Sequence, residues 1–340
     1  MSSAKLWLRV FFAGFAVIVA MLLLTLFTTV PYGDLSRLSR LSDAEFGWQQ
    51  RPPALPEKQF MIAVPLAEAD IVVIGDSFSM THVWQAELVR AGFKVTTIYW
   101  GSYHETMCAD TQQWLVDAGF RGKLVIFESV ERLLKERMRL STQCAHMTAP
   151  FVPRLIPPVT ALAEKPGFAL NSTAKLATGI ITWDRTRRAR EAPGDISFDE
   201  TAVRVVPNGC ELFSNPLCPK VLFFKQDQKA GELDPGDFER MKEFNAKQKL
   251  FPFVWMVIPD KTTTYFVQDH SKAFRDVYLP ANLGPDFFTM AAENRTRIKD
   301  FYFPNDTHMS TYGQEIMGKM MLQAVRETLA RSTAAPQHRD

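Results

Sequence analysis

The sequence predicts an α/β fold with a parallel sheet, an N-terminal transmembrane helix and a mid-chain insertion. Beyond residue 70, short β-branched runs alternate with segments of helical character, as in parallel sheets with crossover helices. A long apolar run precedes this part, and residues 140–250 interrupt its rhythm. We therefore expect a cytoplasmic tip and membrane anchor over residues 1–33, a linker over 34–69, and an α/β domain over 70–335 with an insertion at about 140–250.

The anchor is predicted from an uncharged run over residues 10–33, which follows Lys5 and Arg9. Its core, residues 10–27, is about long enough to cross a bilayer. The alternative is a cleaved signal peptide, but the run is long for one and no Ala-x-Ala precedes Pro31. We expect an uncleaved single-pass helix, with the remainder of the chain outside the cytoplasm.

The composition is that of a folded globular protein, with 46% hydrophobic and 22% charged residues. A net charge of +2, without a basic run interleaved with aromatics, argues against nucleic-acid binding. No histidines cluster with the cysteines at zinc-ligand spacing, so we expect no metal and no cofactor.

The four cysteines are compatible with two disulfides. Cys210 and Cys218 bracket a loop that suits a local disulfide, and Cys108 and Cys144 are then left to form a second. The alternative is four buried thiols, because pairing does not follow from sequence. An exported location favours the disulfides.

Apolar runs predict the strands of the α/β part, and helical spacing predicts the helices between them. The expected strands are residues 71–74, 94–100, 124–127, 253–258 and 301–303. The expected helices are residues 82–90, 105–118, 131–139 and 310–330. In the linker, Pro52, Pro53 and Pro56 predict an extended conformation.

The insertion is rich in proline and has no clear period, which suggests a small β-rich subdomain. Its expected strands are residues 203–206 and 221–224. The arginine run at residues 185–190 is interpreted as a solvated face, and the alternative is a patch for an anionic polymer or a lipid headgroup.

Two local patterns carry chemistry. The buried strand at residues 71–74 runs into Gly75, Asp76 and Ser77, with a helix predicted beyond. This strand–turn–helix order presents a serine hydroxyl at a sheet edge, as a nucleophile elbow does, although Gly-x-Ser-x-Gly itself is absent. The alternative for Ser77 is a helix N-cap.

The second pattern lies far downstream. His308 stands just before a predicted helix, and Asp306 precedes it by two residues. A serine needs such a base, oriented by an acid, because its hydroxyl is a weak nucleophile at neutral pH. The alternative is a turn and helix cap, since Asn-Asp-Thr is a good turn former.

Together the Gly-Asp-Ser-Phe-Ser block at residues 75–79 and the Asp-Thr-His block at residues 306–308 resemble the SGNH/GDSL hydrolase superfamily. More narrowly, they are similar to periplasmic polysaccharide O-acetyltransferases of the alginate acetylation J and X type. The Pro-x-Lys-x-x-x-Tyr segment at residues 259–265 is also similar to a segment of that group. The resemblance covers about residues 70–129 and 251–329, and it implies a three-layer α/β/α domain.

The chain departs from these families in three respects. Its serine precedes its histidine, as in ordinary SGNH hydrolases and peptidoglycan O-acetyltransferases, whereas the alginate proteins have the reverse order. The ordinary superfamily places its acid three residues before the histidine, where this chain has Asn305. The third SGNH block supplies an asparagine that is absent here. In its place stands a Glu-x-x-x-Arg ending from Glu128 to Arg132, similar to endings in the acetyltransferase group.

The resemblance implies a catalytic triad of Ser77, His308 and Asp306. The backbone amides of Ser77 and Gly101 are expected to form an oxyanion hole, because Gly101 matches the position of the second SGNH block. The alternative for Gly101 is a turn glycine.

Three further residues are candidates for substrate binding. Arg132 is a candidate for the acyl oxygen or the sugar acceptor, and the alternative is a Glu128–Arg132 helix ion pair. Lys261 and Tyr265 are candidates to line the acceptor cleft, and the alternative is that they are ordinary loop residues after a strand.

The resemblance implies a membrane-anchored O-acetyltransferase in the inner membrane of a bacterium, with its catalytic domain in the periplasm. Its acceptor is expected to be an exopolysaccharide or cell-wall glycan, and its acetyl donor to come from a multi-span membrane-bound O-acyltransferase. The alternatives are a periplasmic carbohydrate esterase or deacetylase with the same triad, and a non-catalytic assembly subunit of SGNH fold.

Overall fold

The computed structural model describes residues 3–334 except residues 153, 154, 158, 160, 162, 163, 168 and 173. The chain forms two compact units, and each is described by itself. The first unit comprises Met1–Arg51, Glu164–Lys225 and Tyr302–Thr307. The second unit comprises Pro52–Ala163, Gln226–Phe301 and His308–Asp340.

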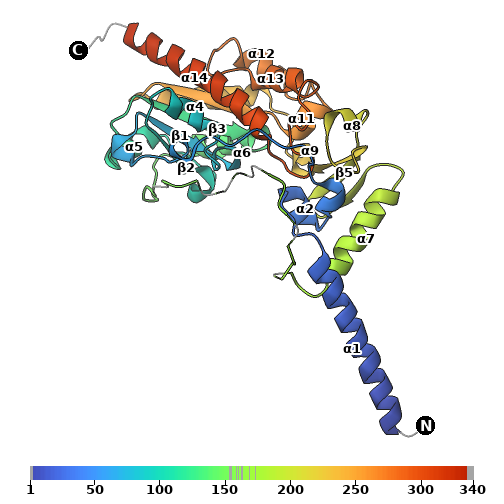
Figure 1. Cartoon of the computed structure of the whole chain (residues 1–340). Helices are drawn as coiled ribbons and strands as arrows, with labels where there is room; N and C mark the ends of the chain where they lie inside the picture. The colour runs from blue at the N-terminus through green and yellow to red at the C-terminus, as the bar shows by residue number, and fades with distance from the viewer. Residues whose placement is uncertain are drawn as a thin grey trace. The chain divides into compact units, whose positions relative to one another are not determined.

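The second unit is built on a four-stranded parallel sheet (Figure 1). The strand order is β2-β1-β3-β7, with β1 (Ile71–Gly75), β2 (Val95–Tyr99), β3 (Leu124–Val130) and β7 (Phe253–Ile258). Every residue of β1 and β3 is buried, as expected for central strands that are covered on both faces. The predicted α/β class, with a parallel sheet and these four strands, is confirmed.

Helices surround this sheet. They are α4 (Gln85–Arg90), α5 (Thr111–Asp117), α6 (Glu131–Gln143), α9 (Gln226–Lys229), α10 (Pro235–Lys247), α11 (Lys261–Tyr265), α12 (Lys272–Tyr278), α13 (Phe287–Asn294) and α14 (Thr311–Ala334). Short 3-10 turns are η1 (Lys58–Phe60), η2 (Leu66–Glu68), η3 (Ser77–Ser79) and η4 (Trp100–Tyr103). Aromatic packing joins α10 to the sheet, because Phe127 lies 5.2 Å from Phe244 and 5.1 Å from Trp255 between ring centroids.

Two helices begin later than the sequence predicts. His82 has a φ of 57°, in the left-handed region, so α4 begins only at Gln85. His104 and Glu105 have φ values of 53° and 57°, and α5 begins only at Thr111. Left-handed backbone ends a right-handed helix, and hydrophobic spacing alone does not reveal it.

The fifth strand predicted at residues 301–303 is not formed. Phe301 and Tyr302 are fully buried, but Tyr302 makes only an isolated bridge. Pro304 follows and has no N–H to give to a ladder. The chain then turns, with the Asp306 N–H donating to the Phe303 carbonyl at 3.4 Å.

The first unit holds a three-stranded antiparallel sheet in the order β4-β5-β6. The strands are β4 (Ile196–Phe198), β5 (Thr201–Val205) and β6 (Lys220–Phe224). The strands expected at residues 203–206 and 221–224 are therefore present as β5 and β6. The helices of this unit are α1 (Ser3–Phe27), α2 (Asp34–Ser39), α3 (Asp43–Phe46), α7 (Thr178–Glu191) and α8 (Gly209–Leu212).

Residues 34–51 differ from an extended linker. They form α2 and α3, and they bury Leu35 and Phe46 in a small core that also contains Val203 and Leu222. Burial of such side chains stabilises by about 1.5–3 kcal/mol each, which offsets part of the entropy lost when this segment is ordered.

The helix α1 is long and apolar enough to cross a membrane, and among the described residues no other helix is. Its large apolar side chains are mostly exposed, as Phe11 and Val17 are at 52% and 58%. The expected N-terminal apolar helix is confirmed.

Both expected cysteine pairs are bonded. Cys108 bonds to Cys144 in the second unit, and Cys210 bonds to Cys218 in the first. The pairs are separated by 36 and 8 residues along the chain, respectively.

The first prediction concerns the Cys108–Cys144 disulfide. The Cys108→Ser/Cys144→Ser variant should lose roughly 3–4 kcal/mol of unfolding free energy, because a long loop is released in the unfolded chain. The Cys210→Ser/Cys218→Ser variant releases a shorter loop and should lose less, roughly 2–3 kcal/mol. Calorimetry and urea unfolding of the full chain in detergent micelles measure both losses. A larger loss in the short-loop variant would contradict the prediction.

Candidate active site

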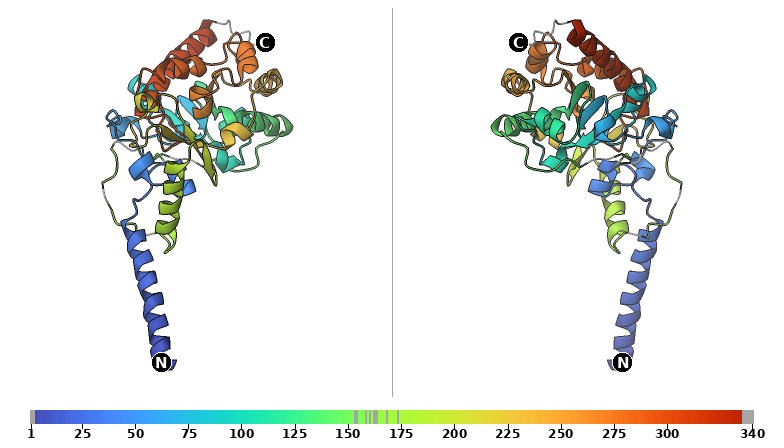
Figure 2. Two further views of the ribbon diagram at one scale, coloured as in Figure 1. Left: turned by 90° about the vertical axis from the view of Figure 1, so that its right-hand side faces the viewer. Right: turned by 90° about the vertical axis from the view of Figure 1, so that its left-hand side faces the viewer.

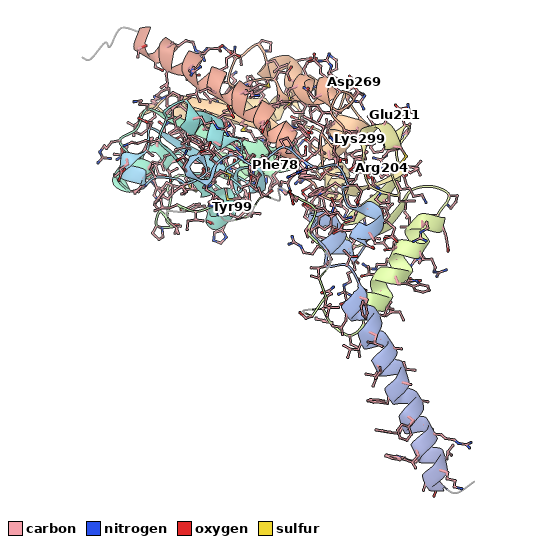
Figure 3. The ribbon with its side chains drawn as sticks, viewed as in Figure 1. Phe78, Tyr99, Arg204, Glu211, Asp269 and Lys299 are labelled. Carbon is pink, nitrogen blue, oxygen red and sulfur yellow. A yellow bond between two sulfur atoms is a disulfide. The ribbon has the colours of Figure 1, made fainter. Side chains whose placement is uncertain are left out.

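The serine turn lies at the carboxyl end of β1. The strand ends at Gly75, and Asp76 caps the 3-10 turn η3 by accepting from the Phe78 N–H at 3.0 Å. Phe78, next to Ser77, is labelled in Figure 3. The predicted strand–turn junction is present: the 3-10 turn η3 follows β1, and the predicted helix follows as α4 from Gln85. A turn this short offers little macrodipole, since that effect needs aligned peptide units.

His308 lies against Ser77. Its Nε2 is 2.7 Å from the Ser77 hydroxyl oxygen, although the two residues are 231 positions apart in the chain. Both side chains are half-buried, and the Phe78 ring lies 4.7 Å from the imidazole between centroids. A hydroxyl and an imidazole at this distance have the geometry that a nucleophile and its general base require.

Asp306 belongs to the first unit. Its carboxylate accepts from the Asp34 N–H at 2.9 Å, and the Asp34 carboxylate accepts from the Thr307 N–H at 2.9 Å. These bonds tie the Asp306–Thr307 segment to the start of α2. The role of Asp306 as the acid behind His308 stays a prediction.

Asn305 stands where ordinary SGNH hydrolases place their acid, and its role here is structural. It is fully buried, and its side-chain amide donates to the Asp43 carboxylate at 3.0 Å. Its carbonyl accepts from the Leu35 N–H at 3.1 Å. Asn305 thus holds α2 and α3 within the first unit.

Asp76 connects the serine turn to the neighbouring strand and helix. Its carboxylate accepts from the Val130 N–H at 2.8 Å and pairs with the Arg137 guanidinium at 2.8 Å. Burial by itself would raise the pKa of Asp76, but Arg137 and the backbone donors outweigh it and lower that pKa. Asp76 is therefore a buried, ionised group.

Arg137 is almost fully buried on α6, and it joins Asp76 to the η4 region. Its Nε donates to Glu105 at 2.8 Å and its Nη1 to the Ser129 hydroxyl at 2.8 Å. Its guanidinium carbon also lies 5.1 Å from the centroid of the Trp100 ring. The Arg137 guanidinium is thus held by acceptors of the protein itself.

Glu128 is a second buried carboxyl beside the serine turn. Its Oε2 accepts from the Asp76 N–H at 2.7 Å and from the Ser79 hydroxyl at 2.8 Å. Its Oε1 has no hydrogen-bond partner among the described residues. Burial and, next, the charge of Asp76 raise the pKa of Glu128 well above its ordinary value, which favours the neutral acid.

Gly101 follows β2 just as Ser77 follows β1. Gly75 and Tyr99 are paired in the parallel register, so Ser77 and Gly101 each lie two residues beyond a paired strand end. A Cβ on Gly101 would lie 2.4 Å from the Tyr99 ring, so a side chain here would require that ring to move. The contribution of Gly101 to an oxyanion hole stays a prediction.

Arg132, Lys261 and Tyr265 lie at the carboxyl ends of β3 and β7. Arg132 pairs with Asp260 at 2.6 Å and with Asp227 at 3.4 Å. Glu128 is hydrogen-bonded to the serine turn, so the alternative Glu128–Arg132 pair is not the arrangement found. Burial opposes the charge of Arg132, but Asp260 and Asp227 outweigh it and raise the pKa of Arg132.

Lys261 and Tyr265 begin and end α11, and both are buried. Asp260, just before α11, donates its N–H to the Glu131 carboxylate at 3.0 Å. Burial and, next, the neighbouring Asp227 raise the pKa of Asp260 well above its ordinary value, against the pull of Arg132. The three candidates therefore border a buried polar cluster, and their contact with a substrate stays a prediction.

The residues that sequence reasoning missed are four acids and one arginine that are hydrogen-bonded around the site, of which Glu105 is partly exposed and the others are buried: Glu105, Arg137, Asp227, Glu131 and Asp260. A signal for Arg137 was present, because it falls on the same face of α6 as the buried Leu134 and Ser141. Arg132 pairs with Asp227, which is 95 residues away in the chain, and with Asp260, which is 128 residues away. No local sequence pattern predicts such distant pairs.

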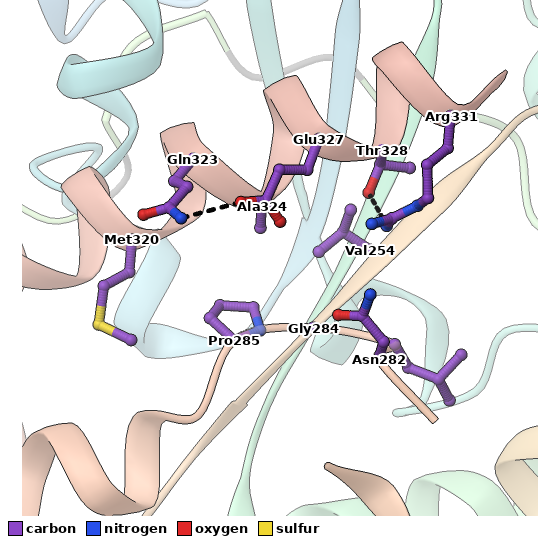
Figure 4. A pocket seen from close by; sticks show the side chains of 11 residues that line it. Val254, Asn282, Gly284, Pro285, Met320, Gln323, Ala324, Glu327, Thr328 and Arg331 are labelled. Carbon is purple, nitrogen blue, oxygen red and sulfur yellow. Dashed lines mark hydrogen bonds between the residues drawn. The ribbon is translucent and has the colours of Figure 1, made fainter. Parts of the chain in front are cut away.

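A separate hollow of about 210 Å³ lies between α14 and the loop before α13 (Figure 4). It is lined by Asn282, Pro285, Met320, Thr328 and Arg331, among others, and by none of the predicted site residues. Gly284 lets this loop approach β7, since a Cβ there would lie 1.8 Å from the Trp255 carbonyl oxygen. We assign it no part in the serine–histidine chemistry.

The second prediction concerns the pH dependence of stability. The folded-state pKa of Glu128 is raised, so the folded chain keeps this proton at pH values where the unfolded chain has lost it. The free energy of unfolding should therefore fall as pH rises from about 4.3 through the folded-state pKa. In wild type this fall should reach at most about 1.4 kcal/mol per pH unit. Glu128→Gln cannot ionise, so its free energy of unfolding should not show this fall.

Urea unfolding of wild type and of Glu128→Gln at several pH values, from about pH 5 to about pH 8, measures the difference between their pH slopes. Glu136→Gln, at an exposed acid on the neighbouring helix α6, should keep the wild-type slope. Parallel pH profiles for wild type and Glu128→Gln would show that Glu128 is not held neutral by the fold.

Comparison with known proteins adds no assignment. No family model, no curated protein and no solved structure matches the chain. The functional argument therefore rests on the geometry of the residues themselves.

Proposed function

We propose that this chain is a membrane-anchored O-acetyltransferase of the SGNH type, with its second unit as a three-layer α/β/α catalytic domain in the bacterial periplasm. It moves an acetyl group through acetyl-Ser77 to hydroxyls of an exopolysaccharide or cell-wall glycan. The observation that carries the proposal is the 2.7 Å approach of His308 Nε2 to the Ser77 hydroxyl at the carboxyl edge of the sheet. This is the edge at which open parallel sheets bind their ligands.

In the proposed first half-reaction, His308 takes the Ser77 proton while the serine oxygen attacks an acetyl ester or thioester carbonyl. Asp306 orients the imidazole and stabilises its cation. The backbone amides of Ser77 and Gly101 hold the oxyanion, and such donors are commonly worth about 10²–10³ in rate. Collapse expels the leaving group, which takes the proton from His308, and leaves acetyl-Ser77.

In the second half-reaction, a glycan hydroxyl gives its proton to His308 and attacks the acetyl carbon. The serine oxygen leaves and recovers that proton, so the enzyme returns to its starting state. Arg132, Lys261 and Tyr265 are the proposed acceptor-side residues. The two carboxylates on Arg132 fix its position, so its contribution is to shape this side of the site rather than to supply an uncommitted charge.

The proposed location follows from the anchor and the disulfides. The helix α1 has the length and apolarity of a membrane span, and two disulfides favour an oxidising compartment. One apolar helix does not carry acetyl groups across a bilayer. We therefore propose a multi-span membrane-bound O-acyltransferase as the partner that delivers the acetyl donor.

The third prediction tests the acetyl-enzyme. The full chain in detergent micelles, incubated with p-nitrophenyl acetate, should gain the mass of one acetyl group at Ser77. Ser77→Ala should gain none there, and His308→Ala should acylate about 10²–10⁴-fold more slowly because it lacks the base. Intact mass and peptide mapping measure the adduct, with and without added oligosaccharides.

Transfer of the acetyl group to sugar in preference to water would support the transferase. Rapid release of acetate that is indifferent to sugar would indicate an esterase with the same residues. Acetylation at other nucleophiles, unchanged in Ser77→Ala, would contradict the role of Ser77.

The fourth prediction tests the acid. Asp306→Asn should lower the acylation rate about 10²–10⁴-fold and lower the apparent pKa of the pH–rate profile, because the imidazolium loses its counter-charge. Stopped-flow release of p-nitrophenolate across pH measures both. Glu211→Gln, an exposed acid elsewhere in the first unit, is the control and should behave as wild type. An unshifted profile in Asp306→Asn would assign the acid elsewhere.

A further inference from the structure

The end of α1 is held by α7 and by the loop before it. The Thr25 hydroxyl donates to the Leu176 carbonyl at 2.6 Å and accepts from the Gly179 N–H at 3.2 Å. A Cβ on Gly179 would lie 2.6 Å from the Thr25 nitrogen, so the two backbones touch at this point. Figures 1 and 2 show the start of α7 beside the end of α1.

The contact with Thr25 sets the depth of α7 in any membrane that α1 crosses. The uncharged run begins at Val10 and ends before Asp34. A hydrocarbon core of about 30 Å takes roughly 20 helical residues, which from Val10 reaches about residue 29. Thr25 then lies just inside the outer edge of the core, and the first turn of α7 lies at the same depth.

The side chains at this depth suit such a place. Ile180 and Trp183 are 42% and 56% exposed and share one face of α7 at a spacing of three residues, and Leu176, two residues before α7, is 39% exposed. Leu170, in the loop before α7, is 52% exposed. Four large apolar side chains exposed within the stretch from residue 170 to residue 183 are unusual for a unit that meets only water.

The sequence of α7 changes character just beyond these residues. Residues 178–183 carry no charge, whereas residues 184–191 are dominated by arginine and acids. The Arg187 guanidinium lies 5.2 Å from the centroid of the Trp183 ring. Tryptophan is enriched where acyl chains meet headgroups. The arginines just beyond pair with acids, as Arg187 does with Asp184 and Arg190 with Glu45, but these pairs are exposed, so anionic headgroups can compete for them.

We infer that Leu170, Leu176, Ile180 and Trp183 form an apolar collar that lies in the outer interface of the bilayer, with the arginines of α7 at headgroup level. This rests on the proposed membrane crossing of α1 and is independent of the proposed acetyl transfer. The occupant of the face is lipid, because the depth of the collar is set by the same helix that crosses the bilayer. The collar fixes the first unit against the membrane surface rather than leaving it on a flexible stalk.

The test uses the full chain with one added cysteine, since all four native cysteines are in disulfides. Ile180→Cys is labelled with an environment-sensitive NBD dye in vesicles of phosphatidylethanolamine and phosphatidylglycerol. Nitroxide lipids carry the quencher either near the headgroup or deep in the acyl chain. Val17→Cys on α1 and Gly194→Cys, an open position just beyond α7, are the matched controls. Circular dichroism and intact mass verify each labelled protein.

The expected result is strong quenching of the Ile180 probe by the shallow nitroxide, quenching of the Val17 probe by the deep one, and quenching of the Gly194 probe by neither. If the Val17 probe is quenched but the Ile180 probe behaves as Gly194 does, the collar is overturned and the anchor stands. If the Val17 probe is not quenched, the crossing of α1 and the collar both fail. A blue-shifted Ile180 probe that neither nitroxide reaches would show that protein covers this face, which also overturns the inference.

Discussion

The buried carboxylate of Asp76 is the group on which the placement of Ser77 most depends. It accepts from the Phe78 N–H in the serine turn, from the Val130 N–H at the end of β3, and from the Arg137 guanidinium on α6. A turn, a strand and a helix therefore share one negative charge. Removal of one partner from such a pair leaves an uncompensated buried charge, which costs about 3–5 kcal/mol. The serine is thus held by an interaction that is expensive to disturb.

The same charge determines the state of Glu128. Two carboxyl groups this close, with one guanidinium nearby, do not both ionise easily, so the pKa of Asp76 is lowered and the pKa of Glu128 is raised. Asp76 holds Arg137 directly, whereas Glu128 keeps an oxygen without a partner among the described residues. Geometry therefore assigns the charge to Asp76 and the proton to Glu128. Two buried carboxyl groups therefore lie next to the serine turn. Asp76 is ionised and holds the turn by hydrogen bonds, and Glu128 is the neutral acid beside it.

The serine turn, the sheet and the apolar helix were predictable because each is written in a short, local pattern. Because β1 and β3 are buried on both faces, each begins with four apolar residues in a row, and such runs predict strands directly. The late start of α5 was not predictable: the left-handed backbone at His104 and Glu105 excludes these residues from a helix, and hydrophobic spacing does not show it. Nor was the structure of residues 34–51, whose order comes from contacts with strands far along the chain.

The ionic partners of the site were hidden for a different reason. A charged residue on an amphipathic helix is usually solvated, so Arg137 does not attract attention unless its phase on α6 is followed residue by residue. Asn305 shows the opposite case. It stands at a position that the family pattern gives to an acid, yet in this chain it is a buried amide that joins Asp43 and α2. Spacing alone does not distinguish a catalytic from a structural role.

The buried cations at the edge of the sheet bear on the kind of substrate. Arg137 is paired with Asp76 and Glu105, and Arg132 with Asp260 and Asp227. A site that recognises phosphate or carboxylate needs cations that turn to the ligand, and pairing with internal acids withdraws them from that task. A neutral ester and a neutral hydroxyl make no such demand, since they need a base, an orienting scaffold and amide donors. For the proposed transferase, the internal pairing of Arg132 and Arg137 agrees with an uncharged ester donor and an uncharged hydroxyl acceptor.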